Sequence, residues 1–328
     1  MENDISNEGV ILVLGVTGSG KSYFLNKLKS HSAKEGHGLK SETAQCQAVQ
    51  ILLDDDDDED SKDRRSITVI DTPGFDDTNR PQGEILAEIT EFLATQHALR
   101  MPLRGVLYLH KITDNKMTGS SLTYLRLLRS LVGEDALGNV VLVTSMWNKL
   151  RDEDRNEALR REQELIDEYW GPMQKKGSYV DQFDGTSESA FGLVYQLAGK
   201  ESVVLDVQRE IMDEDKSILG TAAGMDLANK LKQDIQAYQA KVDELEQELQ
   251  SELEAQPRNK DRIRALREAK EQVEKLLELV KESMERMNDR PGSSIRDRIL
   301  GILKERRNDA LIVLTTVLHL ALTVVFGG

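Results

Sequence analysis

The amino-acid sequence predicts an α/β domain with a mostly parallel, doubly wound sheet, followed by an α-helical hairpin and a short hydrophobic C-terminal helix. Three observations support this fold class. Short apolar runs alternate with helical stretches, a glycine-rich loop follows the first run, and two long amphipathic stretches come later. A chain of 328 residues exceeds one typical domain, which agrees with an α/β unit carrying a helical appendage.

The predicted strands are short apolar runs, and the first of them sets the pattern. Residues 10–14 are continuously apolar and are closed by Gly15, and residues 22–28 then read as a helix. A further helix is expected at residues 121–131, so that strands and helices alternate over about residues 8–200. The other predicted strands are residues 47–53, 67–70, 106–109 and 140–143, with a last strand starting at Tyr179.

Two long amphipathic stretches follow the α/β domain. In each, apolar residues recur at spacings of three and four, the period of a helix with one apolar face. Pro257 and its polar neighbours separate the two stretches, which favours an antiparallel hairpin. A hairpin packed on the domain and a dimerising coiled coil both fit this pattern. The first stripe holds Leu227, Leu231, Ile235, Tyr238, Val242, Leu245 and Leu249, and the second holds Ile263, Leu266, Val273, Leu277, Val280, Met284 and Met287.

These patterns divide the chain into four parts. We expect an N-terminal tail at residues 1–8, the nucleotide-binding-type α/β domain at 9–205, the helical extension at 206–290, and a flank with a hydrophobic C-terminal segment at 291–328. The flank interleaves basic and apolar residues, namely Arg296, Arg298, Lys304, Arg306 and Arg307 with Ile295, Ile299, Ile302 and Leu303.

The C-terminal segment, residues 310–326, is 17 residues long and carries no charge. As a helix it would measure about 25 Å, against a hydrocarbon core of about 30 Å. It therefore predicts a tail anchor with the basic flank on the cytosolic side of a membrane. Because Thr315, Thr316, Thr323 and His319 lower its hydrophobicity, a helix packed on the protein is the alternative.

Composition excludes several classes of function. A formal charge of −15 would repel a nucleic-acid backbone, so DNA and RNA are not expected as partners. Seven of the negative charges form one run at residues 54–60, the composition of a solvated loop. The single cysteine, Cys46, excludes an intramolecular disulfide and suits a reducing compartment. The N-terminus lacks a basic and an apolar region, so no signal peptide is expected.

A phosphate-binding loop is the strongest motif. Residues 15–22 fit G-x-x-x-x-G-K-[ST], between an apolar strand and a helix, the context that the motif requires. Its backbone N–H groups are expected to turn around phosphates at a helix N-terminus, which favours anions. Lys21 is expected to reach the β- and γ-phosphates, and Ser22 to ligate Mg²⁺. The nucleotide-binding residues of this loop are Gly15, Thr17, Gly18, Ser19, Gly20, Lys21 and Ser22.

A second motif agrees with the first. Asp71-Thr72-Pro73-Gly74 follows an apolar strand 49 residues after Ser22, where a GTPase carries its D-x-x-G element. Asp71 is expected to hold Mg²⁺ through water, and Gly74 to bring a backbone N–H to the γ-phosphate. Thr43 lies between the motifs and is the candidate switch threonine that completes the magnesium shell. The predicted metal group is therefore Ser22, Thr43 and Asp71, and the predicted catalytic group is Lys21, Thr43 and Gly74.

These motifs resemble those of the septin-related GTPases, a group that includes the GTPases of immunity-associated proteins and the chloroplast Toc receptors. The resemblance rests on residues 11–22, on residues 41–46 and on residues 70–75, and it spans roughly residues 8–200. It implies a Ras-like G domain, binding of GTP and GDP, dimerisation across the nucleotide face, and often a C-terminal membrane anchor.

The base-recognition element departs from the common pattern. The strand at residues 140–143 ends in Thr144-Ser145-Met146-Trp147 instead of N-K-x-D, so no aspartate is ready for the guanine edge. Thr144 marks the location of this element, and Asn148-Lys149 is a candidate for a shifted N-K pair. The fifth element is expected near residues 184–187. Guanine is favoured because of the resemblance.

The expected function is a GTP-binding, slowly hydrolysing switch with Mg²⁺, dimeric through its nucleotide face and attached to a membrane. Hydrolysis is expected to be slow because Phe75 follows Gly74, where Ras-like enzymes carry the glutamine that orients water. Two alternatives remain open at this point: a nucleotide-binding assembly scaffold with negligible hydrolysis, and an ATP-using P-loop enzyme.

Overall fold

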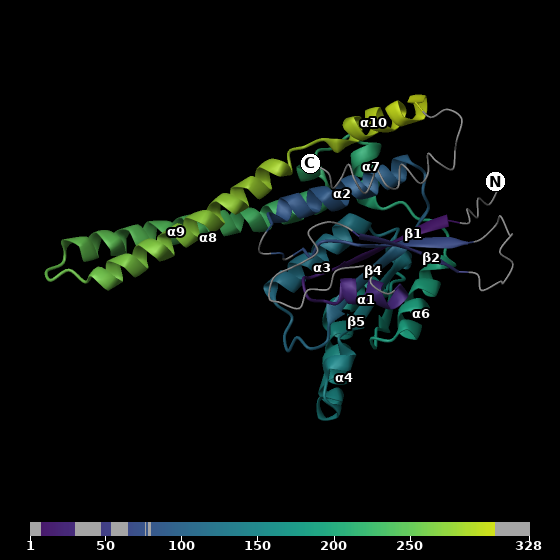
Figure 1. The fold of residues 1–328 in the computed structure, drawn as a ribbon, viewed down its shortest axis with the longest axis horizontal. Coiled ribbons are helices and arrows are strands. Elements are labelled where there is room, and N and C mark those ends of the chain that lie inside the picture. The colour runs from purple at the N-terminus through teal and green to yellow at the C-terminus, as the bar shows by residue number, and fades with distance from the viewer. Residues whose placement is uncertain (1–7, 30–46, 54–64, 76, 78–79, 306–328) are drawn as a thin grey trace.

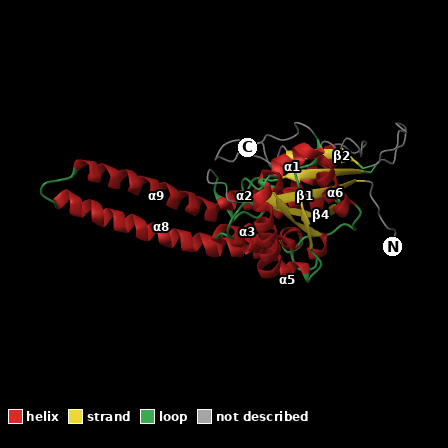
Figure 2. Ribbon diagram, turned by 90° about the horizontal axis from the view of Figure 1, so that it is seen from below, coloured by secondary structure: helices red, strands yellow, loops and turns green. Residues whose placement is uncertain are grey.

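The structure is a computed structural model that describes residues 8–29, 47–53, 65–75, 77 and 80–305. Thr43, Cys46, the acidic run at 54–60 and the hydrophobic segment at 310–326 lie outside the described residues. The described part consists of one α/β domain and a long helical hairpin that projects from it (Figures 1 and 2).

A six-stranded sheet in the order β2-β3-β1-β4-β5-β6 forms the centre of the domain (Figure 1). Only β2 is antiparallel to its neighbour, and the other four pairings are parallel. The mostly parallel sheet predicted from the sequence is therefore confirmed. The strands are β1 (Glu8–Gly15), β2 (Gln47–Leu52), β3 (Ser66–Asp71), β4 (Leu103–Lys111), β5 (Val140–Ser145) and β6 (Tyr179–Gln182).

The central strands are buried along almost their whole length because helices cover both of their faces. On one face, α1 (Lys21–Leu28) and α6 (Ser187–Ala198) pack around Phe24, Leu193 and the inner side of β1. On the other face, α2 (Gln82–Ala98) and α3 (Gly119–Val132) enclose a larger core. A two-sided core of this kind explains why the strands read as continuous apolar runs rather than as alternating ones.

The remaining short helices complete the domain. The segment after β5 forms α4, whose last turn continues as a π-helix and then as α5. The bounds are α4 (Arg155–Glu164), the π-helix η4 (Leu165–Trp170), α5 (Gly171–Gln174) and α7 (Asp206–Met212), with 3-10 turns η1 (Leu137–Asn139), η2 (Trp147–Lys149), η3 (Asp152–Asp154) and η5 (Ile218–Gly220).

The two amphipathic stretches form an antiparallel hairpin of α8 (Ala222–Glu254) and α9 (Lys260–Arg286), with Pro257 in the connection. Figure 2 shows the hairpin extending well beyond the sheet. Val242 and Leu245 of α8 and Ile263 and Leu277 of α9 are buried, as their spacing predicts. Ion pairs such as that between Lys270 and Glu246 join the exposed edges of the two helices.

The base of the hairpin packs on the domain through both of its helices, α8 against α3 and α9 against α2. A Cβ added to Gly83, near the start of α2, would lie 2.0 Å from the backbone oxygen of Ser283 on α9. Only a glycine allows the two helices to approach this closely. The last described helix, α10 (Pro291–Glu305), returns onto α2 and α7 and buries Ile295. Ile295, on the apolar face of the predicted basic flank, thus packs against the domain.

Within the described residues, no helix has the length and apolarity needed to cross a membrane.

Replacing Gly83 by alanine is expected to lower the free energy of unfolding by about 1 to 3 kcal/mol, because the new methyl group must displace the backbone of α9. Gly192→Ala on α6 is the matched control, since a Cβ there meets nothing within 4 Å. The control should be neutral or stabilising by up to about 1 kcal/mol, because alanine is the better helix former. Urea unfolding measures both, and equal effects would contradict a tight junction between α2 and α9.

Candidate functional site

The phosphate-binding loop connects β1 to α1 at the carboxyl edge of the sheet, where ligands of doubly wound folds bind. Gly15 has φ of 151°, and a Cβ there would lie 2.5 Å from the backbone oxygen of Leu109. Gly20 caps α1 in a left-handed conformation with φ of 93°. Gly15 and Gly20 therefore allow a backbone conformation that a side chain would disfavour. The N–H groups at the start of α1 face the loop.

Lys21 lies across this loop. Its Nζ donates to the backbone oxygens of Gly15 and Val16, at 3.0 Å and 3.1 Å, and its side chain is buried. Nearby, no described group hydrogen-bonds the buried Oγ of Ser19. A buried ammonium and an unsatisfied hydroxyl beside a ring of backbone N–H groups suit a phosphate chain.

The predicted metal residues Ser22 and Asp71 are brought together, although they are 49 positions apart in the sequence. Ser22 Oγ donates to Asp71 Oδ2 at 2.7 Å, and Asp71 is fully buried. Its other oxygen, Oδ1, has no hydrogen-bond partner among the described residues. Burial raises the pKa of Asp71, opposed by the charge of Lys21 and the hydrogen bond from Ser22. An under-coordinated carboxylate oxygen beside a hydroxyl fits an oxygen-seeking cation such as Mg²⁺.

The D-x-x-G segment lies directly against the phosphate loop. A Cβ on Gly74 would come within 2.6 Å of the backbone nitrogen of Thr17. Thr72 Oγ1 donates to the backbone oxygen of Val13 at 2.9 Å, which ties the end of β3 to β1. Phe75 is buried and stacks on Tyr124, with ring centroids 5.5 Å apart. The phenyl ring thus belongs to the core.

Thr144 is placed differently from what a base contact needs. Its hydroxyl is buried, donates to Glu162 Oε1 at 2.6 Å and accepts from Trp147 Nε1 at 2.9 Å. The next residue, Ser145, reaches the phosphate loop, because its Oγ donates to the backbone oxygen of Ser19 at 2.6 Å. The sequence offered one signal for this contact: Ser145 is the last residue of β5 and so lies at the same edge as the loop after β1.

The predicted fifth element joins this group through Asn148. Tyr23, which directly follows the metal residue Ser22, donates its hydroxyl to the backbone oxygen of Gly185 and accepts from Asn148 Nδ2, both at 3.1 Å. Hydrogen bonds from Thr186 lower the pKa of Asp184 and hold this loop at the start of α6. The phosphate loop, the end of β5 and the loop after β6 therefore form one continuous surface.

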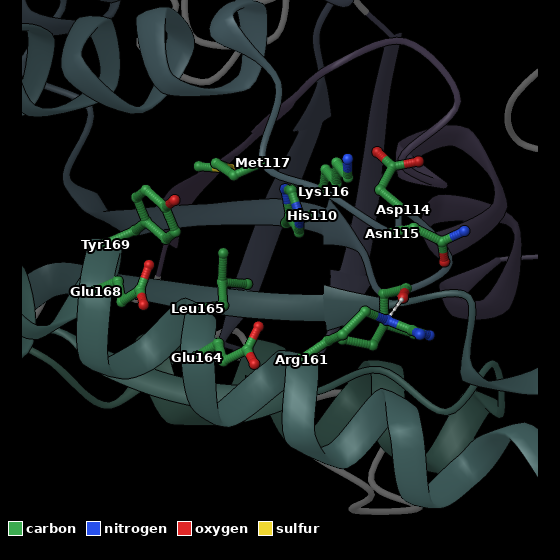
Figure 3. A pocket seen from close by; sticks show the side chains of 11 residues that line it. His110, Asp114, Asn115, Lys116, Met117, Arg161, Glu164, Leu165, Glu168 and Tyr169 are labelled. Atoms are coloured by element: carbon green, nitrogen blue, oxygen red, sulfur yellow. Dashed lines mark hydrogen bonds between the residues drawn. The ribbon is translucent and has the colours of Figure 1, made fainter.

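A cavity of about 330 Å³ adjoins this surface between the segment after β4 and the helices α4 and η4 (Figure 3). His110 lines it, and burial lowers the pKa of His110 so that the imidazole is neutral near pH 7. Lys116 also lines it and is exposed. Lys111 pairs with Asp114, and Arg80 is held on α2 by Glu84 and Glu88. Of these three basic residues, Lys116 is the one with no ion pair to a described residue.

Asp71→Asn is expected to make the metal-free protein more stable at neutral pH. The folded pKa of Asp71 lies above its unfolded value, so ionising it costs stability, and this cost grows from about pH 4 upward until the folded pKa is passed. The gain in Tm should therefore be larger at pH 7 than at pH 4. Thermal unfolding in EDTA measures it, and a less stable variant at pH 7 would contradict the assignment.

Comparisons with known proteins were made on the sequence and on the fold. No curated protein matches the sequence. Solved structures of Toc33 from Arabidopsis thaliana resemble the fold. The structure of Toc33 with GDP and Mg²⁺ is 16% identical, with a TM-score of 0.43, and covers 61% of this chain and 88% of that one. The complex with Mg²⁺ and GMPPNP is 17% identical, with a TM-score of 0.40, and covers 55% and 72%.

A sequence model of the AIG1 family matches residues 9–176, which include the phosphate loop, the D-x-x-G segment and the irregular element at the end of β5. The match spans just over half of the chain. The protein, with its P-loop α/β domain, belongs to the AIG1 family.

Proposed function

We propose that this protein is a GTP-binding, slowly hydrolysing switch that uses Mg²⁺. The observation that carries the proposal is the hydrogen bond from Ser22 to the buried carboxylate of Asp71, beside Lys21 in a phosphate-binding loop. A hydroxyl and a carboxylate suit a hard cation, and a lysine in a phosphate-binding loop suits the phosphates. Toc33 has been crystallised with Mg²⁺ and GDP or GMPPNP, which supports the same ligands here.

In this proposal each residue has a separate role. The Ser22 hydroxyl and the Asp71 carboxylate hold the cation, Asp71 through water, and the cation supplies charge neutralisation at the β- and γ-phosphates. Lys21 leaves the backbone oxygens that it now contacts and binds the phosphates. Gly74 donates its N–H to the γ-phosphate, and Thr43 remains the predicted switch threonine. Thr144 supports the base loop from beneath, through its hydrogen bond to Glu162.

The γ-phosphate would be sensed at the segment that leads to the hairpin. Gly74 contacts Thr17 of the phosphate loop, and α2 begins eight residues later at Gln82. Gly83 of α2 contacts α9, and α10 also packs on α2. A change in the D-x-x-G segment therefore reaches the base of the hairpin through one rigid helix, which is the arrangement that an order-disorder switch requires.

Slow hydrolysis follows from Phe75. Its ring is buried against Tyr124 and cannot hydrogen-bond an attacking water. An unassisted site of this kind turns over at or below about 10⁻⁴ to 10⁻³ s⁻¹. The same observation favours a second candidate, a nucleotide-dependent assembly scaffold in which hydrolysis is negligible. Single-turnover hydrolysis by the full chain separates the two.

Acceleration would come from a second subunit docked on the nucleotide face. For Toc33 a dimerisation-deficient mutant has been crystallised, and dimerisation is important for the GTPase activity of the chloroplast translocon components atToc33 and psToc159. In this chain Lys116 is the basic residue placed for such a role, because it is exposed at the same edge as the phosphate loop. A cation brought to the γ-phosphate can accelerate hydrolysis by about 10³-fold or more.

We also propose attachment to the cytosolic face of a membrane through residues 310–326, supported by their lack of charge and by the basic residues before them. Flotation of the full chain with liposomes, compared with a chain that ends at Asn308, measures this. Equal recovery of both chains with the lipid would contradict the proposal.

Lys21→Ala should weaken GTP binding by about 100-fold or more, because charged hydrogen bonds to the phosphates are lost. Lys29→Ala is the matched control, since Lys29 is exposed at the end of the same helix. Isothermal titration with GTP and Mg²⁺ gives both affinities, and circular dichroism checks that each variant folds. Unchanged affinity in the Lys21 variant would remove the phosphate-loop assignment.

GTP turnover per molecule should rise with protein concentration and then reach a plateau if a second subunit activates hydrolysis. Lys116→Ala should flatten this rise by removing the cation, whereas Lys232→Ala, an exposed position on α8, should leave it unchanged. Steady-state phosphate release, with light scattering to follow association, provides the measurement. A constant specific rate across a range in which dimers form would reject activation in trans.

A further inference from the structure

The metal group shows on which side of the phosphate loop the nucleoside must lie. Asp71 ends β3 and Gly74 follows it, so the cation and the terminal phosphate belong on the β3 side of β1. The nucleoside then extends in the opposite direction, over the ends of β5 and β6. The hydrogen bond from Ser145 to Ser19 connects this region to the phosphate loop. Asn148 and Gly185, which follow β5 and β6, are therefore placed beside the base.

Tyr23 fixes the orientation of the Asn148 amide. A tyrosine hydroxyl has one hydrogen, and Tyr23 gives it to the backbone oxygen of Gly185. Its oxygen must then accept, which it does from Asn148 Nδ2. With the nitrogen directed at Tyr23, the amide oxygen Oδ1 is left as the acceptor. No described residue donates to this oxygen, and Asn148 is exposed.

The partners in this relay are themselves held in place. The Tyr23 ring lies 5.9 Å from the ring of Phe183, and the ammonium of Lys27 lies 5.0 Å from its centroid. Gly185 has φ of 92°, and a Cβ there would lie 2.6 Å from Asn148 Nδ2. A glycine is thus required at position 185 for the Asn148 amide to approach. The fold therefore fixes the direction of the two hydrogen bonds, from Asn148 to Tyr23 and from Tyr23 to Gly185.

We propose that Asn148 Oδ1 is the specificity-determining acceptor of the site, and that it accepts a hydrogen bond from N1–H of a 6-oxopurine. This inference rests on the proposed function, because it assigns the base contact of the same nucleotide site. Adenine is rejected because its N1 is an acceptor and would oppose the lone pairs of Oδ1. Among the neighbouring polar side chains, Thr144 is engaged by Glu162, and Asp184 accepts two hydrogen bonds from Thr186 through Oδ1.

An amide reads the base differently from a carboxylate. A carboxylate accepts from both N1–H and the 2-amino group of guanine, whereas this amide offers one oriented acceptor. The site should therefore not prefer guanine over hypoxanthine, because the second hydrogen of Nδ2 faces position 2 and would oppose the 2-amino group of guanine, which is also a donor. It should also tolerate xanthine, because the second hydrogen of Nδ2 can donate to a carbonyl at position 2. The chain is thus a 6-oxopurine binder with relaxed selectivity at position 2.

The test is a set of affinities of the full chain for GDP, IDP, XDP and ADP with Mg²⁺. We expect wild type to bind GDP no more tightly than IDP and XDP at least as tightly as IDP. ADP should bind about tenfold or more weakly than IDP, which is the value of one neutral hydrogen bond or slightly more. Asn148→Asp should prefer GDP over IDP by about tenfold and should bind XDP about tenfold more weakly than GDP, because a carboxylate opposes the 2-carbonyl.

A double mutant separates orientation from stability. Tyr23→Phe frees the amide to turn, so the preference for GDP over ADP should fall several-fold. In the Asn148→Asp background the same change should leave that preference intact, since a carboxylate presents an acceptor in either orientation. Tyr195→Phe is the matched control, because its exposed hydroxyl contacts Leu53 far from this site. A purely structural effect of Tyr23 would appear equally in both backgrounds.

The outcomes distinguish this inference from the proposed function. A full chain that binds no purine nucleotide would overturn both. A chain that binds GDP, but whose ratios among the four nucleotides are unchanged by Asn148→Asp, would overturn the assignment of Asn148 alone. A shift in those ratios caused by Asp184→Asn instead would transfer the base contact to the loop after β6.

Discussion

The parallel pairing of β1 with β3 and β4 is the constraint on which the site depends. Its register places Val13 opposite Asp71 and Gly15 opposite Leu109. The phosphate loop and the metal carboxylate therefore leave the sheet at the same edge, one strand apart. Because both faces of these strands are buried, a slip of one residue would exchange the two cores and separate Ser22 from Asp71. The 2.7 Å hydrogen bond between them is a consequence of that register.

Three hydrogen-bonded connections take the place of an N-K-x-D element. Ser145 joins the end of β5 to the phosphate loop, Tyr23 joins the start of α1 to Asn148, and Glu162 joins Thr144 to Gln182 at the end of β6. Each connection is between side chains or loops from different elements. In the proposed function these connections would support the base, with an oriented amide in place of the carboxylate of an N-K-x-D element.

The same edge of the sheet leads to the hairpin. The D-x-x-G segment enters α2, and α2 carries both the close contact with α9 and the docking surface of α10. In packed interiors small displacements are transmitted because they are not absorbed by voids. The helix that senses the γ-phosphate in the proposed function therefore contacts the helical extension directly through α9, while α3 holds the base of α8.

Local sequence patterns determined the strands, the hairpin and the phosphate loop, because each depends on residues close together in the chain. The strands follow from short apolar runs, the hairpin from helical spacing, and the loop from the G-x-x-x-x-G-K-S motif. The D-x-x-G segment was recognisable for the same reason. The orientation of individual side chains was not, since it depends on partners far away in the chain. Thr144 was expected near the base, yet Glu162 and Trp147 draw its hydroxyl into the core. Asn148 was a candidate for a shifted N-K pair, but only its contact with Tyr23, 125 positions earlier, gave its amide a direction. The tertiary structure alone decided these contacts, because a hydrogen bond between distant residues leaves no periodic pattern in the sequence.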